Sequence, residues 1–207
     1  SALARLLPLQ QSAFRVLHQA DWLLGLFSGR FDVSDENNAL KSGYDPVQRL
    51  WPSWMREVGA DIRKLPQVLA AGTRVARILP AVAVAFGLPD DVEIVTGTTD
   101  GCAAFLASGA HEAGDGATSL GTTLTLKLLS ATPVFAPQYG IYSHRIGAQW
   151  LAGGASNSGG AVLRQFFSAE DIVRLTPLMD AKVPTGLGYY PLPKIGERFP
   201  INDPGML

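Results

Sequence analysis

VEIVTGTTDGCAAFLASGA, residues 92–110, joins a predicted strand directly to the start of a predicted helix. The β-branched run at residues 92–95 is typical of a short strand, and the small side chains at residues 102–108 favour a closely packed helix. Between them, Gly97-Thr98-Thr99-Asp100 turns the chain. Asp100 therefore stands at a strand edge, immediately before a helix.

Mainly β structure is predicted on the C-terminal side of this stretch. TSLGTTLTLKLLS, residues 118–130, is typical of a hairpin with a tight tip at Gly121-Thr122-Thr123. Further expected elements are strands at residues 141–144 and 149–151, a Gly-rich turn at 153–160 and a helix at 161–167. Because the sequence before residues 111–116 is mainly helical, we expect a domain boundary there.

The first third of the chain is typical of helical pieces separated by polar turns. Apolar residues 20–27 predict a packed helix that stops at Gly29, and residues 78–86 predict another that is closed by Gly87. Residues 30–45 are crowded with Asp, Asn and Ser side chains, which bond to nearby backbone and favour turns. We therefore expect an irregular loop there, at the surface or facing a ligand.

The composition is that of an ordinary globular chain. Its 207 residues, 47% of them hydrophobic and 17% charged, can bury one large core or two small ones. Seventeen Lys and Arg against eighteen Asp and Glu leave a net charge of -1, which gives no reason to expect nucleic acid or a membrane as partner. The single cysteine, Cys102, favours a reducing compartment. We expect a cytoplasmic location, or an organelle stroma.

Two Gly-rich turns are candidates for binding phosphate. Glycine lets the backbone approach an anion, backbone N–H groups donate to it, and Thr or Ser hydroxyls add further donors. Gly121, Thr122 and Thr123 form one such turn, and Gly159-Gly160 forms the other, ahead of a helix whose N-terminus favours anions. Neither turn matches the P-loop or the dinucleotide fingerprint. Taken alone, each is more often a plain structural turn.

Asp100 has two interpretations. An Asp just before a helix is a preferred N-cap, whose carboxylate accepts hydrogen bonds from free backbone N–H groups. The alternative is a general base, presented at a strand edge to accept a proton, which typically contributes about 10²–10⁴-fold to a rate. The residues alone favour the structural interpretation.

Other chemistry-bearing side chains give weaker signals. The histidines stand far apart without the spacing of metal ligands, at His18, His111 and His144. Cys102 has no activating His nearby in sequence, so we expect a buried, inert thiol. Trp51 and Trp54 are expected in the core or at an exposed aromatic corner, with stacking on a sugar as the alternative.

Several segments together resemble the FGGY family of carbohydrate kinases, and within it the D-ribulose kinase (pentulose kinase) branch. The stretches at residues 92–110 and 118–130 resemble the junction of the family's two domains. Further likenesses are ADWLLGLFSG, DENNALKSGYDP, YGIYSHRIG, WLAGGASNSGGAVLRQFF and GLGYYPLPKIGERFPINDP. The likeness spans nearly all of the chain, which resembles a central fragment of the longer family members.

The resemblance implies an α/β fold of actin-like, ribonuclease H-like architecture, in which two domains close over sugar and ATP. Residues 1–110 would be the latter part of the sugar-binding N-terminal domain, and residues 117–207 the first part of the nucleotide-binding C-terminal domain. The family's N-terminal phosphate loop and later adenine-binding segment have no counterpart here. The chain alone is therefore expected to be inactive.

The implied activity is transfer of phosphate from ATP, with Mg²⁺, to a sugar hydroxyl, with a ketopentose such as D-ribulose as the expected acceptor. Asp100 would be the catalytic base, while Gly121, Thr122, Thr123 and Gly160 would contact the ATP phosphates. No residue is assigned to the metal. Two alternatives stay open, a non-catalytic sugar- or nucleotide-binding module of the same fold and a structural interaction domain.

Overall fold

The chain divides into two compact units, which we describe separately. The computed structural model describes residues 2–180 and 182–207. Unit 1 comprises Ser1–Ala107 and His144–Trp150, and unit 2 comprises Ser108–Ser143 and Leu151–Leu207. The chain thus changes unit after residues 107, 143 and 150. The first change precedes the expected boundary at residues 111–116, and the assignment of family domains to these units stays a prediction.

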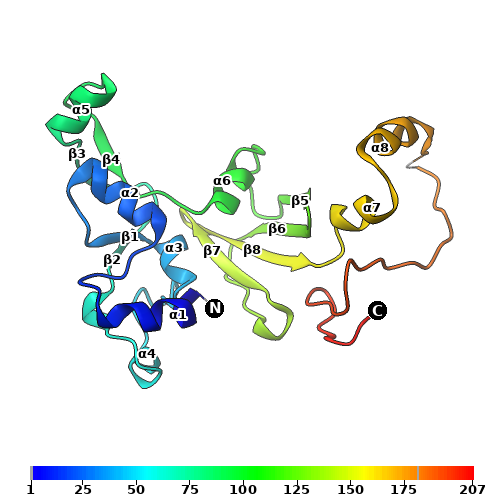
Figure 1. Ribbon diagram of the computed structural model, residues 1–207, viewed down its shortest axis with the longest axis horizontal. Coiled ribbons are helices and arrows are strands. Elements are labelled where there is room, and N and C mark those ends of the chain that lie inside the picture. The colour runs from blue at the N-terminus through cyan, green and yellow to red at the C-terminus, as the bar shows by residue number, and fades with distance from the viewer. Residues whose placement is uncertain (1, 181) are drawn as a thin grey trace. The chain divides into compact units, whose positions relative to one another are not determined.

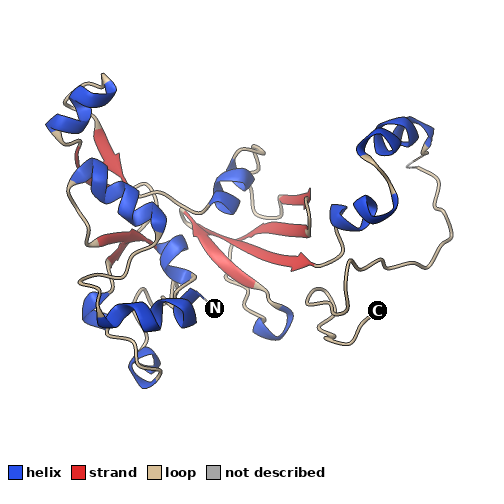
Figure 2. Ribbon diagram, viewed as in Figure 1, coloured by secondary structure: helices blue, strands red, loops and turns tan. Residues whose placement is uncertain are grey.

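Unit 1 interleaves short helices with two small sheets (Figure 2). β1 pairs with β2 in parallel, and β3 pairs with β4 in antiparallel fashion. Its elements in chain order are α1 (Ala2–Leu6), the 3-10 helix η1 (Leu7–Gln11), α2 (Gln19–Ser28), β1 (Val33–Asp35), α3 (Glu36–Leu40), α4 (Trp54–Glu57), the 3-10 helix η2 (Ile62–Lys64), β2 (Gln67–Leu69), β3 (Arg74–Arg77), α5 (Pro80–Phe86), β4 (Glu93–Val95) and α6 (Asp100–Leu106).

The structure confirms the helices predicted at residues 20–27 and 78–86, together with the residues that end them. α2 ends at Gly29, which adopts φ 77° and donates its N–H to the Gly25 carbonyl. α5 begins at Pro80, whose missing N–H is no loss in a first helical turn, and it ends at Gly87 with φ 63°. Because a side chain resists this left-handed backbone, glycine fixes where each helix stops.

The expectation of an irregular loop over residues 30–45 is wrong. Val33–Asp35 form β1, Glu36–Leu40 form α3, and residues 33–39 are all buried. The expected bonding of polar side chains to local backbone does occur, but it caps a helix: the Asp35 carboxylate accepts hydrogen bonds from the N–H groups of Asn37 and Asn38. The polar cluster therefore starts regular structure and carries buried side chains.

Unit 2 contains most of a four-stranded sheet in the order β5-β6-β8-β7 (Figure 1). β5 and β6 pair in antiparallel fashion with Leu120 opposite Leu124, which confirms the predicted hairpin and its tip at residues 121–123. The elements from residue 108 onward are β5 (Gly116–Leu120), β6 (Leu124–Ser130), the 3-10 helix η3 (Pro137–Tyr139), β7 (Tyr142–Ile146), β8 (Gln149–Ser156), α7 (Gly160–Phe166), α8 (Ala169–Leu175) and the 3-10 helix η4 (Thr176–Leu178).

The Gly-rich turn before α7 is shorter than expected. Residues 153–156 continue β8 as a strand, so only residues 157–159 separate it from the helix. A Cβ built on Gly154 would lie 2.7 Å from Cδ2 of Phe199. This strand glycine therefore marks the close approach of the C-terminal segment and not a turn.

Candidate functional site

Asp100 is the first residue of α6 and does not cap it. Thr99 is the N-cap, and its Oγ1 accepts a hydrogen bond of 3.3 Å from the Cys102 N–H. Asp100 accepts a bond of 2.7 Å from the adjacent Gly101 N–H, and its side chain is exposed. The predicted capping role of Asp100 is therefore wrong, because the preceding threonine fills it. The Asp100 carboxylate remains open to a ligand.

The turn that leads to Asp100 is held by hydrogen bonds on both sides. Thr96 is 2% exposed, and its hydroxyl donates to the Ala70 carbonyl at 2.6 Å and accepts from the Thr73 N–H at 2.9 Å. Two residues further on, Thr98 Oγ1 accepts a bond of 2.9 Å from the amide of Asn37. The short run between β4 and α6 therefore has little freedom to move.

Asn37 was interpreted from the sequence only as a turn-forming residue, and no role at the site was predicted for it. Its side chain is completely buried, and besides the bond to Thr98 it donates to the Arg145 carbonyl and accepts from the Arg145 N–H, both at 2.9 Å. Arg145 lies 108 residues away along the chain, so no local pattern pairs the two. The density of Asp, Glu and Asn at residues 35–38 was the available signal, and it was interpreted as turn chemistry.

Unit 1 also contains two buried carboxylates, those of Glu36 and Asp21. Burial raises the pKa of Glu36, which is 4% exposed, although positive charge on Arg49 and Arg145 partly offsets the rise. Burial also raises the pKa of Asp21 to about 6, against hydrogen bonds from Ser34 and the His18 N–H. Unit 1 therefore holds acidic groups whose charge is poorly solvated.

In unit 2, the two predicted phosphate turns lie against each other. The Gly160 N–H donates to the Gly121 carbonyl at 2.7 Å, which fastens the start of α7 to the hairpin tip. A Cβ on Gly159 would lie 2.6 Å from the Thr122 carbonyl oxygen, and one on Gly160 would lie 2.8 Å from the Gly121 oxygen. Glycine is needed at both positions because the backbones are this close.

This contact changes which groups can reach a phosphate. The Gly121 N–H already donates to the Thr123 carbonyl, and the Gly160 N–H is engaged by Gly121, so neither is an unused donor. No hydrogen bond within the described residues engages the hydroxyls of Thr122, which is exposed, or Thr123, which is half-buried. Together with the backbone N–H groups of Thr122 and Thr123, which likewise donate to no carbonyl of the described residues, the two hydroxyls are the donors that this turn offers to an anion.

Glu197 holds the chain at the end of β8, just before Gly159 and Gly160, and no role was predicted for it from the sequence. Burial alone would raise its pKa, but hydrogen bonds from the Asn157 N–H, the Ser156 hydroxyl, the Arg198 N–H and the Tyr190 hydroxyl together lower it to about 2. The carboxylate thus stays charged and fixes the chain as it leaves β8. The lone acidic residue within GERFP was the available signal.

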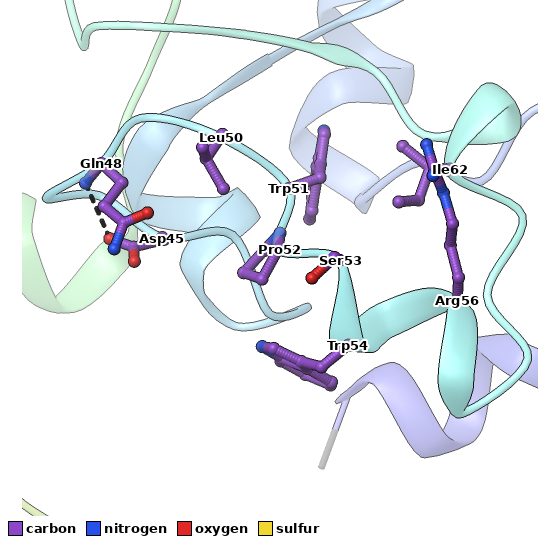
Figure 3. Close-up of a pocket in the computed structure, with 9 residues that line it drawn as sticks. All are labelled: Asp45, Gln48, Leu50, Trp51, Pro52, Ser53, Trp54, Arg56 and Ile62. Carbon is purple, nitrogen blue, oxygen red and sulfur yellow. Dashed lines mark hydrogen bonds between the residues drawn. The ribbon is translucent and has the colours of Figure 1, made fainter.

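The two tryptophans line a surface cavity of about 490 Å³ in unit 1 (Figure 3). Trp54 is 44% exposed, as an aromatic corner would be. The polar groups beside it serve the local fold, since Trp51 donates to the Pro66 carbonyl and Asp45 accepts from the N–H groups of Val47 and Gln48. Gln48, Ser53 and Arg56 also line the cavity and carry polar side chains that could direct a sugar, so the structural role and sugar stacking both stay predictions.

Other residues considered from the sequence do not come together. Cys102 is fully buried, as expected. His18 is bonded to the Ser42 hydroxyl, while His111 is exposed and donates its backbone N–H to Asp115. Within residues 2–180 and 182–207, no group of three His, Cys, Asp or Glu side chains is arranged to hold a metal ion. In the same part of the chain, no helix has the length and apolar character of a membrane span.

No family model matches the chain, but solved structures do. A xylulose kinase from Rhodospirillum rubrum superimposes with a TM-score of 0.77 at 20% identity, over 89% of this chain and 41% of that one. A gluconate kinase from Lactobacillus acidophilus gives 0.73 at 17% identity, over 86% and 40%. Plasmodium falciparum glycerol kinase with ADP gives 0.66 at 13% identity, over 87% and 38%. The chain has part of a carbohydrate kinase fold.

This carbohydrate kinase fold confirms the expected fold class, an α/β chain that is partial. The chain spans about two fifths of the length of the structures it matches. The three matched kinases are named for different acceptors, so the fold does not single out the D-ribulose branch. The roles of Asp100 and the Thr122–Thr123 turn stay predictions.

Proposed function

We propose that the chain is the central part of an ATP-dependent carbohydrate kinase whose acceptor is a ketopentose such as D-ribulose. The observation that carries the proposal is the exposed Asp100 carboxylate, on a turn tied down by Thr96 and Thr98, within a fold shared with sugar and polyol kinases. The ketopentose rests on the sequence resemblance around residues 92–130. The single cysteine favours a cytoplasmic location.

Asp100 acts as the general base in this proposal. Its carboxylate accepts the proton of the sugar hydroxyl while the hydroxyl oxygen bonds to the γ-phosphorus of ATP. The bond from that phosphorus to the β,γ-bridging oxygen breaks, and ADP leaves. No covalent enzyme intermediate is needed. Thr99 caps α6, so the Asp100 carboxylate can take this role without giving up a structural one.

Unit 2 serves the phosphate side of the reaction. The hydroxyls of Thr122 and Thr123 donate to phosphate oxygens, and the substrate is ATP carrying its own Mg²⁺. Gly121 and Gly160 contribute by their close backbone contact, which fixes the hairpin tip against the start of α7. Donors carried on a fixed backbone stabilise charge on the transferring phosphoryl group with little reorganisation during the reaction.

The assignment is tested by Asp100→Asn in the full-length protein. Asn keeps the size of the side chain but cannot take the proton, so turnover should fall by about 10²–10⁴-fold while sugar and ATP bind nearly as before. A coupled assay of ADP release gives kcat, and titration calorimetry gives Kd. D-ribulose, D-xylulose, glycerol and gluconate are compared as acceptors.

Near-normal turnover in a folded Asp100→Asn protein overturns the base assignment. Binding of sugar and ATP without turnover in the wild-type protein would instead identify a non-catalytic binding module of the same fold.

A further inference from the structure

We propose that Asn37 is a positioning residue that holds the Asp100 turn in its working geometry. The claim that Asn37 affects turnover rests on the function proposed above. The claim that Asn37 holds the turn rests only on contacts within unit 1. Asn37 lies 61 residues from Thr98 and 108 residues from Arg145, yet its side chain bonds to both. It joins three segments that the sequence keeps far apart.

The Asn37 side chain uses both of its donors and one acceptor site. One amide hydrogen goes to Thr98 Oγ1 and the other to the Arg145 carbonyl, each at 2.9 Å. The amide oxygen accepts from the Arg145 N–H, also at 2.9 Å. The paired bonds to one backbone residue fix the plane of the amide, and that plane aims the remaining donor at Thr98. The hydroxyl of Thr98 thereby anchors a residue two positions before Asp100.

The helix that carries Asn37 is itself held firmly. Asp35 is 3% exposed and accepts the N–H groups of Asn37 and Asn38 at 2.9 Å each, together with the Asn38 amide at 2.7 Å. Arg145 is restrained in turn, since its guanidinium lies 5.0 Å from the centre of the Trp150 ring. The anchor of the Asp100 turn is therefore attached to two restrained segments.

Loss of the Asn37 side chain has a predictable effect on Asp100. Thr98 loses the amide that donates to its hydroxyl, and the Arg145 N–H and carbonyl lose their buried partner. The backbone before Asp100 is then free to adopt other conformations. Misplacing a catalytic group by about 1 Å can cost about 10²-fold in rate. The effect should fall on kcat, because the sugar contacts made by the rest of the protein are unaffected.

The proposal is tested in the full-length protein with Asn37→Ala and a matched control, Asn38→Ala. The control also removes a buried amide from α3, but that amide bonds to Asp35 and not to the turn. We expect kcat to fall about 10–100-fold in Asn37→Ala with little change in the sugar KM. In Asn38→Ala the N–H groups of residues 37 and 38 still bond to Asp35 and hold α3, so kcat should change less than about threefold. Equal losses of kcat in the two variants overturn the proposal.

A second pair of variants keeps the test sharp if Asn37→Ala folds poorly. Thr98→Val removes the hydroxyl that accepts the Asn37 amide, while Thr98→Ser keeps it. Thr98→Val should lose kcat as Asn37→Ala does, whereas Thr98→Ser should keep most of the wild-type kcat. Full kcat in Thr98→Val means that the bond does not position Asp100.

Hydrogen exchange separates this proposal from the proposed function. Peptides covering residues 96–103 should exchange faster in Asn37→Ala and Thr98→Val than in Asn38→Ala and the wild type. If the wild type phosphorylates none of the tested acceptors, the kinase proposal fails, and this exchange difference still decides whether Asn37 holds the turn. Identical exchange in all variants overturns the positioning role.

Discussion

At the scale of single residues, Thr99 is the cap of α6 in the structure, whereas the sequence suggested that Asp100 both caps the helix and acts as a base. Thr99 satisfies the start of α6, and Asp100 beside it is left exposed. Both residue types cap helices well, so propensity alone could not choose between them. The choice depends on where the backbone turns, which is fixed by the bond from Asn37 to Thr98 and the bond from Thr96 to Ala70.

This division predicts opposite outcomes at the two positions. Thr99→Ala should lower the free energy of unfolding by about 1 kcal/mol through loss of the cap. Asp100→Ala should change it by less than about 0.5 kcal/mol, because the side chain is exposed and makes no long-range hydrogen bond. Urea unfolding of both variants measures the difference. A larger loss for Asp100→Ala would restore the capping role to Asp100.

Asp21 predicts a pH dependence of stability. Burial raises its folded pKa from 3.8 to about 6, so between these values the folded state holds a proton that the unfolded state releases. Ionisation therefore costs stability as the pH rises through this window. Asp21→Asn cannot ionise but can still accept the His18 N–H, which Asp21 accepts at 2.9 Å.

The free energy of unfolding of Asp21→Asn should rise relative to that of the wild type by on the order of 2 kcal/mol between pH 4 and pH 6, and the difference should level off above about pH 7. Unfolding curves across this range provide the measurement. A difference that stays constant with pH would show that Asp21 ionises normally in the fold.

At the scale of elements, the hairpin tip and the start of α7 are in close backbone contact. Gly159→Ala would force a Cβ to within 2.6 Å of the Thr122 oxygen, so the tip and the helix must separate. We expect a loss of about 1–3 kcal/mol in stability and a higher KM for ATP. Gly188→Ala is the control, since a Cβ there meets nothing within 4 Å. If the two variants prove equally stable, the backbones are not in close contact.

How far the sequence predicts each element depends on the range of the contacts that form it. The hairpin was predicted over residues 118–130, close to its observed extent of 116–130, because alternation and a Gly-Thr tip are local properties. α3 was missed because a buried Asn side chain such as that of Asn37 is stable only with partners brought from elsewhere, such as Arg145. Likewise, the glycines of β8 looked like a turn because Phe199, which explains Gly154, lies 45 residues further along the chain.

The candidate site follows the same rule. Asp100 and the Gly121–Thr123 tip were named from local pattern and family resemblance, and both lie at element boundaries in the structure. Asn37, which bonds to the Asp100 turn, and Glu197, which bonds to the end of β8 ahead of Gly159, were missed because their bonds reach 61 and 40 residues along the chain. Candidate catalytic and phosphate-binding residues can be recognised from their neighbours in the sequence, whereas the residues that hold them in place bond to distant segments and cannot.

At the scale of the whole molecule, the chain covers about two fifths of the kinases it matches. We therefore predict that residues 1–207 alone do not phosphorylate a sugar, because phosphoryl transfer depends on donors placed all around the γ-phosphate. A coupled assay with D-ribulose, Mg²⁺ and ATP compares this segment with the full-length protein. Activity within tenfold of full length would mean that these residues contain the whole active site.

The return of residues 144–150 to unit 1 has a consequence for synthesis on the ribosome. Asn37 is made 108 residues before Arg145, which at about 5–20 residues per second is an interval on the order of 5–20 s. During that time its amide has no Arg145 backbone to bind, and the first 107 residues cannot reach their final packing. Unit 1 is therefore completed after translation of unit 2 has begun, so the two units cannot mature strictly one after the other.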